Sequence, residues 1–133
     1  MNKATRDKVF QKYNGKCAYS GTDLEGDWQV DHIFPKRCKQ MYKSDIAIKY
    51  YKIRGKHTND IDNLVPCQKI INHYKRGLFI EEFRKHWLGG LHKRLAKLPK
   101  NPKVERSIKH KKYMLKVAGY FGITPDKPFC GKF

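Results

Sequence analysis

Two pairs of adjacent polar residues carry the side chains in this chain that are best suited to chemistry. Asp31 precedes His32, and Asn72 precedes His73 further along the sequence. An imidazole titrates near neutral pH, so His32 is a natural general base for the activation of water. Hard divalent cations bind oxygen ligands, which Asp31 supplies as a carboxylate and Asn72 as an amide carbonyl. The residue types therefore predict metal-assisted activation of water, with Mg²⁺ favoured and Mn²⁺ as a substitute.

Two short strands are predicted to carry part of this set. Residues 28–33 alternate in polarity like a strand that ends before Pro35, and residues 61–66 form a second apolar run that also closes with a proline. Because successive strand residues point to opposite faces, Asp31 and His32 can share a site only where the strand ends and the backbone turns. The position just before Pro35 meets this condition.

Helices are predicted around the strands. Residues 68–76 have a helical pattern in which Asn72, Lys75 and Arg76 share one face. A long basic segment, residues 36–60, separates the two strands, and segments of this length are usually functional or disordered. Further helices are expected over residues 4–13, over residues 78–98 with a break or bend at Gly89-Gly90, and from a start at Asn101-Pro102 to Gly122.

The ordered set of Asp-His, Asn and Asn resembles the HNH, or ββα-metal, nucleases. The similarity is closest to small phage and bacterial HNH endonucleases, and the segment around Cys17 also looks like the HNH domains of RNA-guided CRISPR nucleases. The matching segments are Cys17-Ala18-Tyr19-Ser20-Gly21, Val30-Asp31-His32-Ile33-Phe34-Pro35, Asn63-Leu64-Val65-Pro66 and Asn72-His73-Tyr74-Lys75-Arg76.

The resemblance implies an α+β fold. Its centre would be a ββα-metal (His-Me finger) core with a short two-stranded β-hairpin, flanked by an N-terminal helix and basic C-terminal helices. Residues 1–133 would form a single HNH endonuclease domain, with the core near residues 17–77 and a helical extension near residues 78–133.

The same resemblance implies a metal-dependent endonuclease that hydrolyses DNA phosphodiester bonds by nicking or double-strand cleavage. His32 would activate water, Asp31 and Asn72 would hold the metal, and the amide of Asn63 would hold the backbone of the loop that carries His32. His73 remains a second candidate ligand, because relatives with a His-rich metal site have a histidine at the third motif position. One such centre cuts one strand, so a double-strand break would require a homodimer or successive nicks.

The charge of the chain favours a polyanionic partner. Its 133 residues include 30 Lys and Arg against 12 Asp and Glu, a formal net charge of +18, which fits DNA best. Phosphate contacts are expected from Lys36 and Arg37, from Lys75 and Arg76 on the metal face of the helix, and from the basic helices after Leu78. The alternative is a non-catalytic, basic nucleic-acid-binding protein on an HNH fold, although the intact motif argues against a decayed site. A ribosomal or chromatin-like module would explain the charge but not the ordered motif.

Many HNH relatives hold the fold together with a zinc ion bound by two C-x-x-C pairs, and this chain departs from that pattern. Ser20 replaces the second cysteine of the first pair, and counting on from Asn63 places Gln68 and Ile71 where the second pair would stand. Only Cys17 remains in register, so we expect free thiols and no structural zinc. We expect apolar packing by Tyr19, Ile70, Ile71 and the N-terminal helix to hold the core together in place of zinc.

The rest of the sequence indicates where the protein works. No apolar stretch resembles a signal peptide or a membrane span, so we expect a cytoplasmic protein with no membrane partner, which a phage could encode for action in its host cell. The remaining histidines are expected to be structural or exposed; they are His57, His86, His92 and His110.

Overall fold

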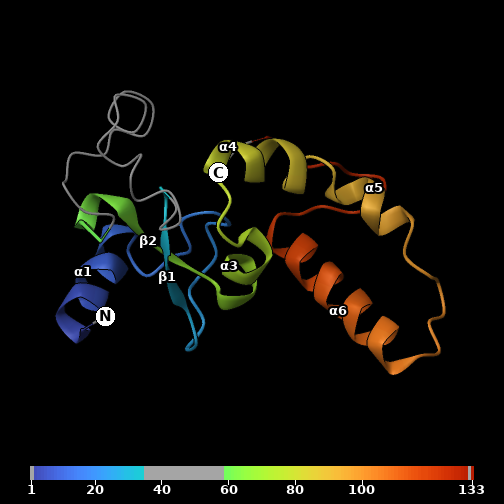
Figure 1. Ribbon diagram of the computed structural model, residues 1–133, viewed down its shortest axis with the longest axis horizontal. Coiled ribbons are helices and arrows are strands. Elements are labelled where there is room, and N and C mark those ends of the chain that lie inside the picture. Colours follow the sequence, from blue (N-terminus) through green and yellow to red (C-terminus); the bar gives the residue numbers. More distant parts are fainter. Residues whose placement is uncertain (1, 35–58, 132) are drawn as a thin grey trace. The chain divides into compact units, whose positions relative to one another are not determined.

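A computed structural model describes residues 2–34, 59–131 and 133 of the chain and has a mixed α+β fold (Figure 1). The chain divides into two compact units, Met1–Ile80 and Glu81–Phe133. The first unit contains the sheet and the motif residues, and the second is helical. This division falls shortly after Gly77, where the sequence predicts the end of the core.

Helix α1 (Lys3–Lys12) opens the first unit and confirms the predicted N-terminal helix. The side-chain oxygen of Asn2 caps it by accepting a hydrogen bond from the Thr5 amide at 2.8 Å. The helix ends in a turn at Gly15, which has a φ of +75° and donates its amide hydrogen to the Phe10 carbonyl at 3.0 Å. A Cβ at position 15 would lie 2.8 Å from the Phe10 ring, so glycine suits this position on both grounds.

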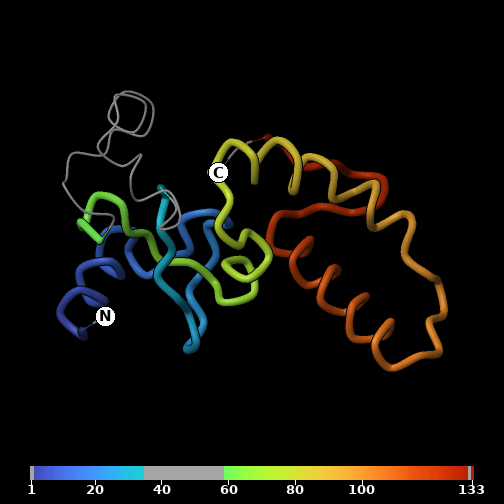
Figure 2. The backbone as a smooth tube through the Cα atoms, in the orientation of Figure 1, coloured from blue at the N-terminus to red at the C-terminus, as the bar shows by residue number. Residues whose placement is uncertain are grey.

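Strands β1 (Gln29–His32) and β2 (Leu64–Cys67) form an antiparallel two-stranded sheet, as the sequence predicts. The register runs from Gln29 opposite Cys67 to His32 opposite Leu64. Figure 2 shows the two strands side by side. All of β2 is buried, which explains why its sequence is continuously apolar rather than alternating.

The segment before β2 fastens α1 to the sheet. Ile61–Asn63 forms a single 3-10 turn, η2, where the sequence predicts the beginning of the second strand. The Lys12 ammonium donates to the Ile61 carbonyl at 2.8 Å and to the Leu64 carbonyl at 2.7 Å. Partial burial lowers the pKa of Lys12, and the Asp62 carboxylate opposes this shift.

Helix α3 (Lys69–Lys75) follows β2 directly and packs against β1. It confirms the predicted helix, with slightly shorter ends. Its residues Ile71 and Tyr74 are buried, whereas Ile70 is partly exposed. Tyr19, in the loop before β1, is buried as well. The expected apolar packing is therefore present for Ile71 and Tyr19.

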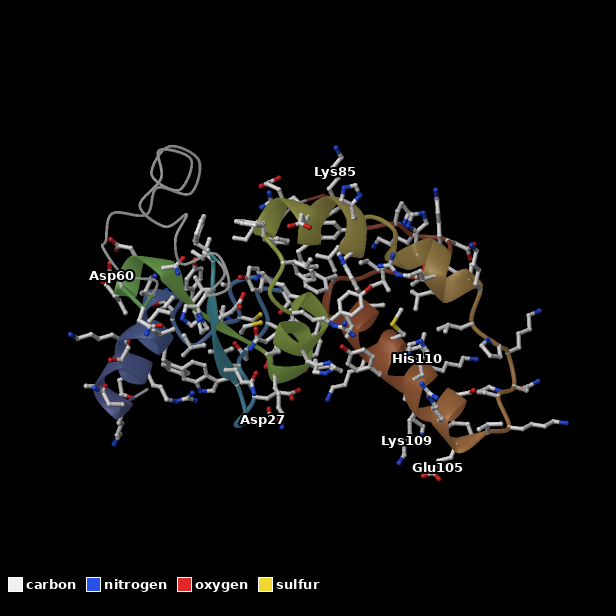
Figure 3. The ribbon with its side chains drawn as sticks, viewed as in Figure 1. Asp27, Asp60, Lys85, Glu105, Lys109 and His110 are labelled. Carbon is white, nitrogen blue, oxygen red and sulfur yellow. The ribbon has the colours of Figure 1, made fainter. Side chains whose placement is uncertain are left out.

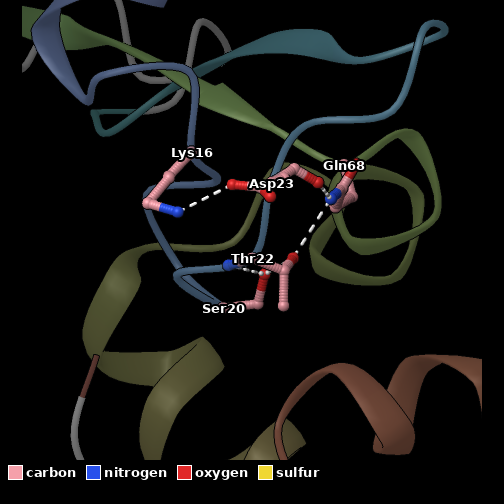
Figure 4. Close-up of polar contacts among 5 residues, drawn as sticks. All are labelled: Lys16, Ser20, Thr22, Asp23 and Gln68. Atoms are coloured by element: carbon pink, nitrogen blue, oxygen red, sulfur yellow. Dashed lines mark hydrogen bonds and ion pairs between the residues drawn. The ribbon is translucent and has the colours of Figure 1, made fainter.

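A polar network adds to this packing and joins the loop at residues 16–25 to the start of α3 (Figure 4). Gln68 is 1% exposed, and its Nε2 donates to Thr22 Oγ1 at 3.1 Å and to the Asp23 carbonyl at 2.7 Å. Its Oε1 accepts a hydrogen bond from the Glu25 amide at 3.0 Å. Ser20 Oγ lies 2.7 Å from Thr22 Oγ1 and completes the connection.

Two buried thiols lie where this loop meets β2: Cys17 belongs to the loop and Cys67 ends the strand. The Ala18 amide donates to the Pro66 carbonyl at 2.9 Å, which brings together the neighbouring residues Cys17 and Cys67. A hydrogen bond with Cys67 lowers the pKa of Cys17 to about 5, while burial raises the pKa of Cys67. Both are free thiols, as is the exposed Cys130.

The second unit begins with an interrupted helix. The short α4 (Ile80–Glu82) continues into the π-helical η3 (Phe83–Leu88), and α5 (Leu91–Ala96) follows after Gly89-Gly90. The sequence predicts one bent helix here; the break at the glycines is confirmed, but the helix is divided into shorter elements. A Cβ on Gly89 would collide with the Lys85 carbonyl, so glycine permits the widened turn at this point.

Helix α6 (Glu105–Tyr120) is the longest element of the second unit and buries Met114, Val117 and Ala118. It begins after Val104, so the predicted start at Asn101-Pro102 is wrong. Val104 has an extended backbone, with a φ of −82° and a ψ of 133°, so the helix begins only after it. The Lys111 ammonium donates to the Pro99 and Lys100 carbonyls of the preceding loop at 2.8 Å each.

A chain of aromatic rings joins the C-terminal segment to η3. The ring centroids of successive pairs lie between 5.9 and 6.3 Å apart, in the order Phe83, Phe121, Phe129 and Phe133. The Arg84 guanidinium lies 4.5 Å from the centroid of the Phe133 ring. Among the residues described, no helix has both the length and the apolar character needed to cross a membrane.

We predict that Gln68→Ala lowers the free energy of unfolding by about 2–3 kcal/mol, because it removes three part-buried hydrogen bonds between the loop and the start of α3. Urea unfolding measures this loss. Lys69→Ala, at the exposed neighbouring position, is the matched control and should change stability by less than about 0.5 kcal/mol. Equal effects of the two substitutions would show that the network does not stabilise the loop.

Candidate metal and catalytic site

The end of β1 presents Asp31 and His32 on opposite faces of the sheet. Asp31 lies opposite Val65 and His32 opposite Leu64, and β1 ends at His32. Both residues lie within the paired strand, and their convergence on one site stays a prediction. Asp31 is 6% exposed, whereas His32 is partly exposed.

Among the described residues, the side-chain contacts of Asp31 are made to one carboxylate oxygen, Oδ2. The Tyr19 hydroxyl donates to Asp31 Oδ2 at 2.5 Å, and the Lys75 ammonium lies 3.0 Å from the same atom. Burial raises the pKa of Tyr19, and the Asp31 charge raises it further, so the hydroxyl keeps its proton and remains a donor. These contacts bring the loop before β1 and helix α3 to one carboxylate.

Asn72 lies at the junction between β1 and α3 that Asp31 and Lys75 also line. We call this junction the seam. Its Nδ2 donates to Gln29 Oε1 at 2.8 Å. Gln29 precedes Asp31 by two residues, so both side chains face α3. Asn72 and Lys75 are three residues apart on α3 and face β1. The structure therefore places Asp31 and Asn72 on facing elements of one seam.

The structure contradicts the prediction that Lys75 contacts phosphate from the surface. Lys75 is fully buried, and its ammonium faces Asp31. The predicted helix face is correct for Asn72 and Lys75, but that face packs against β1 rather than facing solvent. Arg76 is exposed, as a phosphate contact requires, although it lies just beyond the helix with a φ of 56° and a ψ of −144°.

The imidazole of His32 is oriented by Asn59. His32 Nε2 lies 2.7 Å from the side-chain oxygen of Asn59. An amide oxygen only accepts hydrogen bonds, so Nε2 carries the hydrogen and Nδ1 of the neutral ring has the lone pair. A proton acceptor is thereby available on the other edge of the ring.

Asn63 holds the backbone just after His32, in the manner that the resemblance implies. Its Oδ1 accepts a hydrogen bond from the Phe34 amide at 2.7 Å, and its Nδ2 donates to the Phe34 carbonyl at 3.1 Å. The Asn63 carbonyl also accepts a hydrogen bond from the Ile33 amide at 3.0 Å. Asn63 is fully buried, so these contacts are shielded from water.

The remaining predicted site residue that the structure describes is His73, on α3. His73 is exposed on α3, one position after the half-buried Asn72. Lys36 and Arg37 lie outside the described residues. His86 and His110 are exposed and His92 is half-buried, while His57 also lies outside the described part of the chain.

Three residues of the site were not assigned to it from the sequence. Tyr19 is predicted only as an apolar packing residue, and Gln29 and Asn59 are not singled out. A signal existed for Gln29, because alternation along a strand places it on the face of Asp31. No local pattern identifies the contacts of Tyr19 or Asn59, since each is made with a residue distant in the sequence.

The described residues contain no cluster of three or more His, Cys, Asp and Glu side chains arranged to hold a metal ion. Asp31 and Asn72 supply only one carboxylate and one amide, so a metal site built on them would not contain three such side chains. Comparisons with family models, curated proteins and solved structures found no match to this chain. What the site can do follows from its geometry and chemistry.

We predict opposite effects of Arg76→Gly on stability and on DNA binding. Its backbone lies in a region that suits glycine, and relief of this strain should raise the free energy of unfolding by about 1 kcal/mol. Loss of the guanidinium should weaken DNA binding. Arg76→Ala is the control, because it removes the same charge without relieving the strain. A loss of stability in the glycine variant would contradict the prediction.

Proposed function

We propose that this protein is a metal-dependent endonuclease of the HNH type, with a ββα-metal core, that hydrolyses DNA phosphodiester bonds. The observation that carries the proposal is the seam between β1 and α3. Asp31 contacts Lys75 there and Gln29 contacts Asn72, so a carboxylate and an amide from the predicted ligand pair line one strand–helix junction.

The residues of the seam fit a hard divalent cation. Both contacts to Asp31 fall on Oδ2, and Asn72 uses its Nδ2 toward Gln29. The Oδ1 atoms of Asp31 and Asn72 are therefore the proposed ligands for Mg²⁺ or Mn²⁺, with water and the scissile phosphate as the others. When bound, the cation would neutralise charge on the phosphate and assist the leaving 3′ oxygen. The exposed position of His73 favours Asn72 as the ligand from α3.

His32 is the proposed general base. Its Nε2–H is directed to Asn59, which leaves Nδ1 to take a proton from the attacking water. Asn63 is a positioning residue, because its amide fixes the Phe34 backbone two residues beyond His32. Holding the base in one orientation reduces the entropic cost of reaching the transition state.

The hydrogen-bond network at Gln68 takes the structural role that zinc has in many HNH relatives. Ser20 and Gln68 stand at two of the positions where those relatives have cysteines, and both contact Thr22 Oγ1. The loop and the start of α3 are thus joined by part-buried hydrogen bonds to the buried Gln68 side chain. In this proposal the core folds without a structural zinc.

DNA is the proposed partner, and α6 offers a regular set of charges for it. Lys109, Lys112 and Lys116 are exposed at three- and four-residue spacing, on the side of the helix away from buried Met114 and Val117. Figure 3 shows Lys109 projecting from α6 near Glu105, with which it forms an exposed ion pair at 3.0 Å. An exposed pair of this kind contributes little, so phosphate can compete for Lys109.

One observation favours the alternative, a basic nucleic-acid-binding protein without catalysis. Asp31 is buried and paired with the Lys75 ammonium, which is a stable arrangement without any metal. A binding protein would retain DNA in every metal condition and cleave it in none. The cleavage experiment below separates the two functions.

We predict that the protein nicks supercoiled plasmid with Mg²⁺ or Mn²⁺ and not with EDTA. His32→Ala should reduce the rate at least about 100-fold, because general-base catalysis contributes at least this factor, while DNA binding in a gel shift stays near the parent value. Asp31→Ala and Asn72→Ala should raise the metal concentration needed for cleavage. One strand is cut per centre, so nicked circles should precede linear product.

His110→Ala is the control for this experiment, because His110 is an exposed histidine on α6. It should cleave like the parent. If His32→Ala and His110→Ala cleave equally well, the base is wrongly assigned. A gel shift without cleavage in either metal would support the binding protein instead.

We also predict that replacing Lys109, Lys112 and Lys116 together by Gln weakens DNA binding and makes it less dependent on salt. The slope of log K against log salt should become shallower by about 2–3, the value for three lost phosphate contacts. A matched variant replaces the exposed Lys93, Lys97 and Lys100 by Gln and removes the same charge. Equal changes in slope for both variants would show that α6 makes no particular contact.

A further inference from the structure

Lys75 is the most deeply buried cation of the described chain. The residue is 0% exposed, and its side chain is 1% exposed. Lysine is almost never buried to this extent unless it is paired, because removal of an ammonium from water is costly. The role of this side chain therefore needs an explanation beyond packing.

The surroundings of the Lys75 ammonium supply one charge partner. Nζ lies 3.0 Å from Asp31 Oδ2 and 5.9 Å from the centroid of the Tyr19 ring. Within the part of the chain that the structure describes, Nζ has no partner in hydrogen-bonding geometry. Its attraction to Asp31 is thus chiefly that of opposite charges, and Asp31 Oδ2 receives its aligned hydrogen bond from Tyr19 instead.

We infer that Lys75 is an internal counter-ion for Asp31, which holds the carboxylate in place and weakens the binding of a divalent metal to it. The inference rests on the proposed function, in which Asp31 is a metal ligand. Lys75 is then a positioning residue, and a metal ion that binds Asp31 must overcome repulsion from its positive charge. A cation beside the shared carboxylate repels a second cation, so free protein should bind metal weakly.

The approach of a phosphate changes this balance. A bound phosphodiester adds negative charge beside Asp31 and offsets the repulsion between the ammonium and the metal. Metal and DNA should therefore bind cooperatively, and Lys75 should be the source of part of that coupling. Such coupling would restrict metal loading, and with it hydrolysis, to the complex with DNA.

The test measures Mn²⁺ binding to the protein without DNA, by electron paramagnetic resonance of free Mn²⁺. Lys75→Met removes the charge and keeps most of the apolar stem, so it should tighten Mn²⁺ binding by about tenfold or more, the change that corresponds to about 1.4 kcal/mol. Lys69→Met, at the exposed start of the same helix, should bind like the parent. Unchanged or weaker binding by Lys75→Met overturns the inference.

Two further variants keep the test decisive if Lys75→Met fails to fold. Lys75→Gln lacks the charge but can still donate to Asp31, and it should also tighten Mn²⁺ binding. Lys75→Arg keeps the charge and should bind Mn²⁺ like the parent. Circular dichroism of each variant shows whether it is folded. Tightening in Lys75→Arg equal to that in Lys75→Gln would also overturn the inference, since charge would then not be the cause.

Asp31→Asn separates this inference from the proposed function. If the substitution abolishes Mn²⁺ binding while the Lys75 variants bind like the parent, Asp31 is a ligand and only the counter-ion role fails. If Asp31→Asn leaves Mn²⁺ binding unchanged, the metal lies elsewhere and both fail. Loss of binding in Asp31→Asn together with tighter binding in Lys75→Gln supports both.

Discussion

The carboxylate of Asp31 is almost completely removed from water, and a charge in that position must be compensated from within the protein. The compensation comes from two other segments: Tyr19 in the loop before β1 donates a hydrogen bond, and Lys75 at the end of α3 brings the opposite charge. Removal of either partner would leave part of that charge unsatisfied. The loop, strand and helix are therefore fixed relative to one another by a requirement of charge as well as by apolar packing.

The same arrangement determines what the seam between β1 and α3 can do. Once Lys75 faces Asp31, helical geometry brings Asn72 to the same face, where it contacts Gln29. His32 follows Asp31 at the end of β1, and its orientation depends on Asn59 and on Asn63, which holds the backbone of Phe34. The proposed ligands and the proposed base are thus supported by separate contacts, so a substitution in one set should leave the other in place.

The secondary structure of the first unit could be predicted because its signals are local. An alternating run ending before proline indicates β1, and helical spacing indicates α3. The burial of Lys75 could not be predicted in this way, because it depends on Asp31 and Tyr19, which are distant in the sequence. The start of α6 was predicted too early because Asn101-Pro102 matches a local helix-start pattern, whereas the backbone is still extended at Val104.

The sequence predicts which residues could do chemistry at this site, but not the contacts that orient them. The resemblance to HNH nucleases indicated Asp31, His32, Asn63 and Asn72, and their residue types suit the roles that it implies. Gln29 and Asn59 have side chains that are common in loops and on surfaces, so their orienting contacts emerge only in three dimensions. The strained backbone at Arg76 is likewise invisible in a sequence where a charged residue follows a helix.

The central claim is that a divalent metal binds between Asp31 on β1 and Asn72 on α3. The most direct measurement is a titration of ¹⁵N-labelled protein with Mn²⁺, because the paramagnetic ion broadens the amide signals closest to it. The account predicts that signals from residues 29–32 and 72–75 broaden first, and that Asp31→Asn removes the effect. Early broadening confined to other parts of the chain, or broadening unchanged in Asp31→Asn, would contradict it.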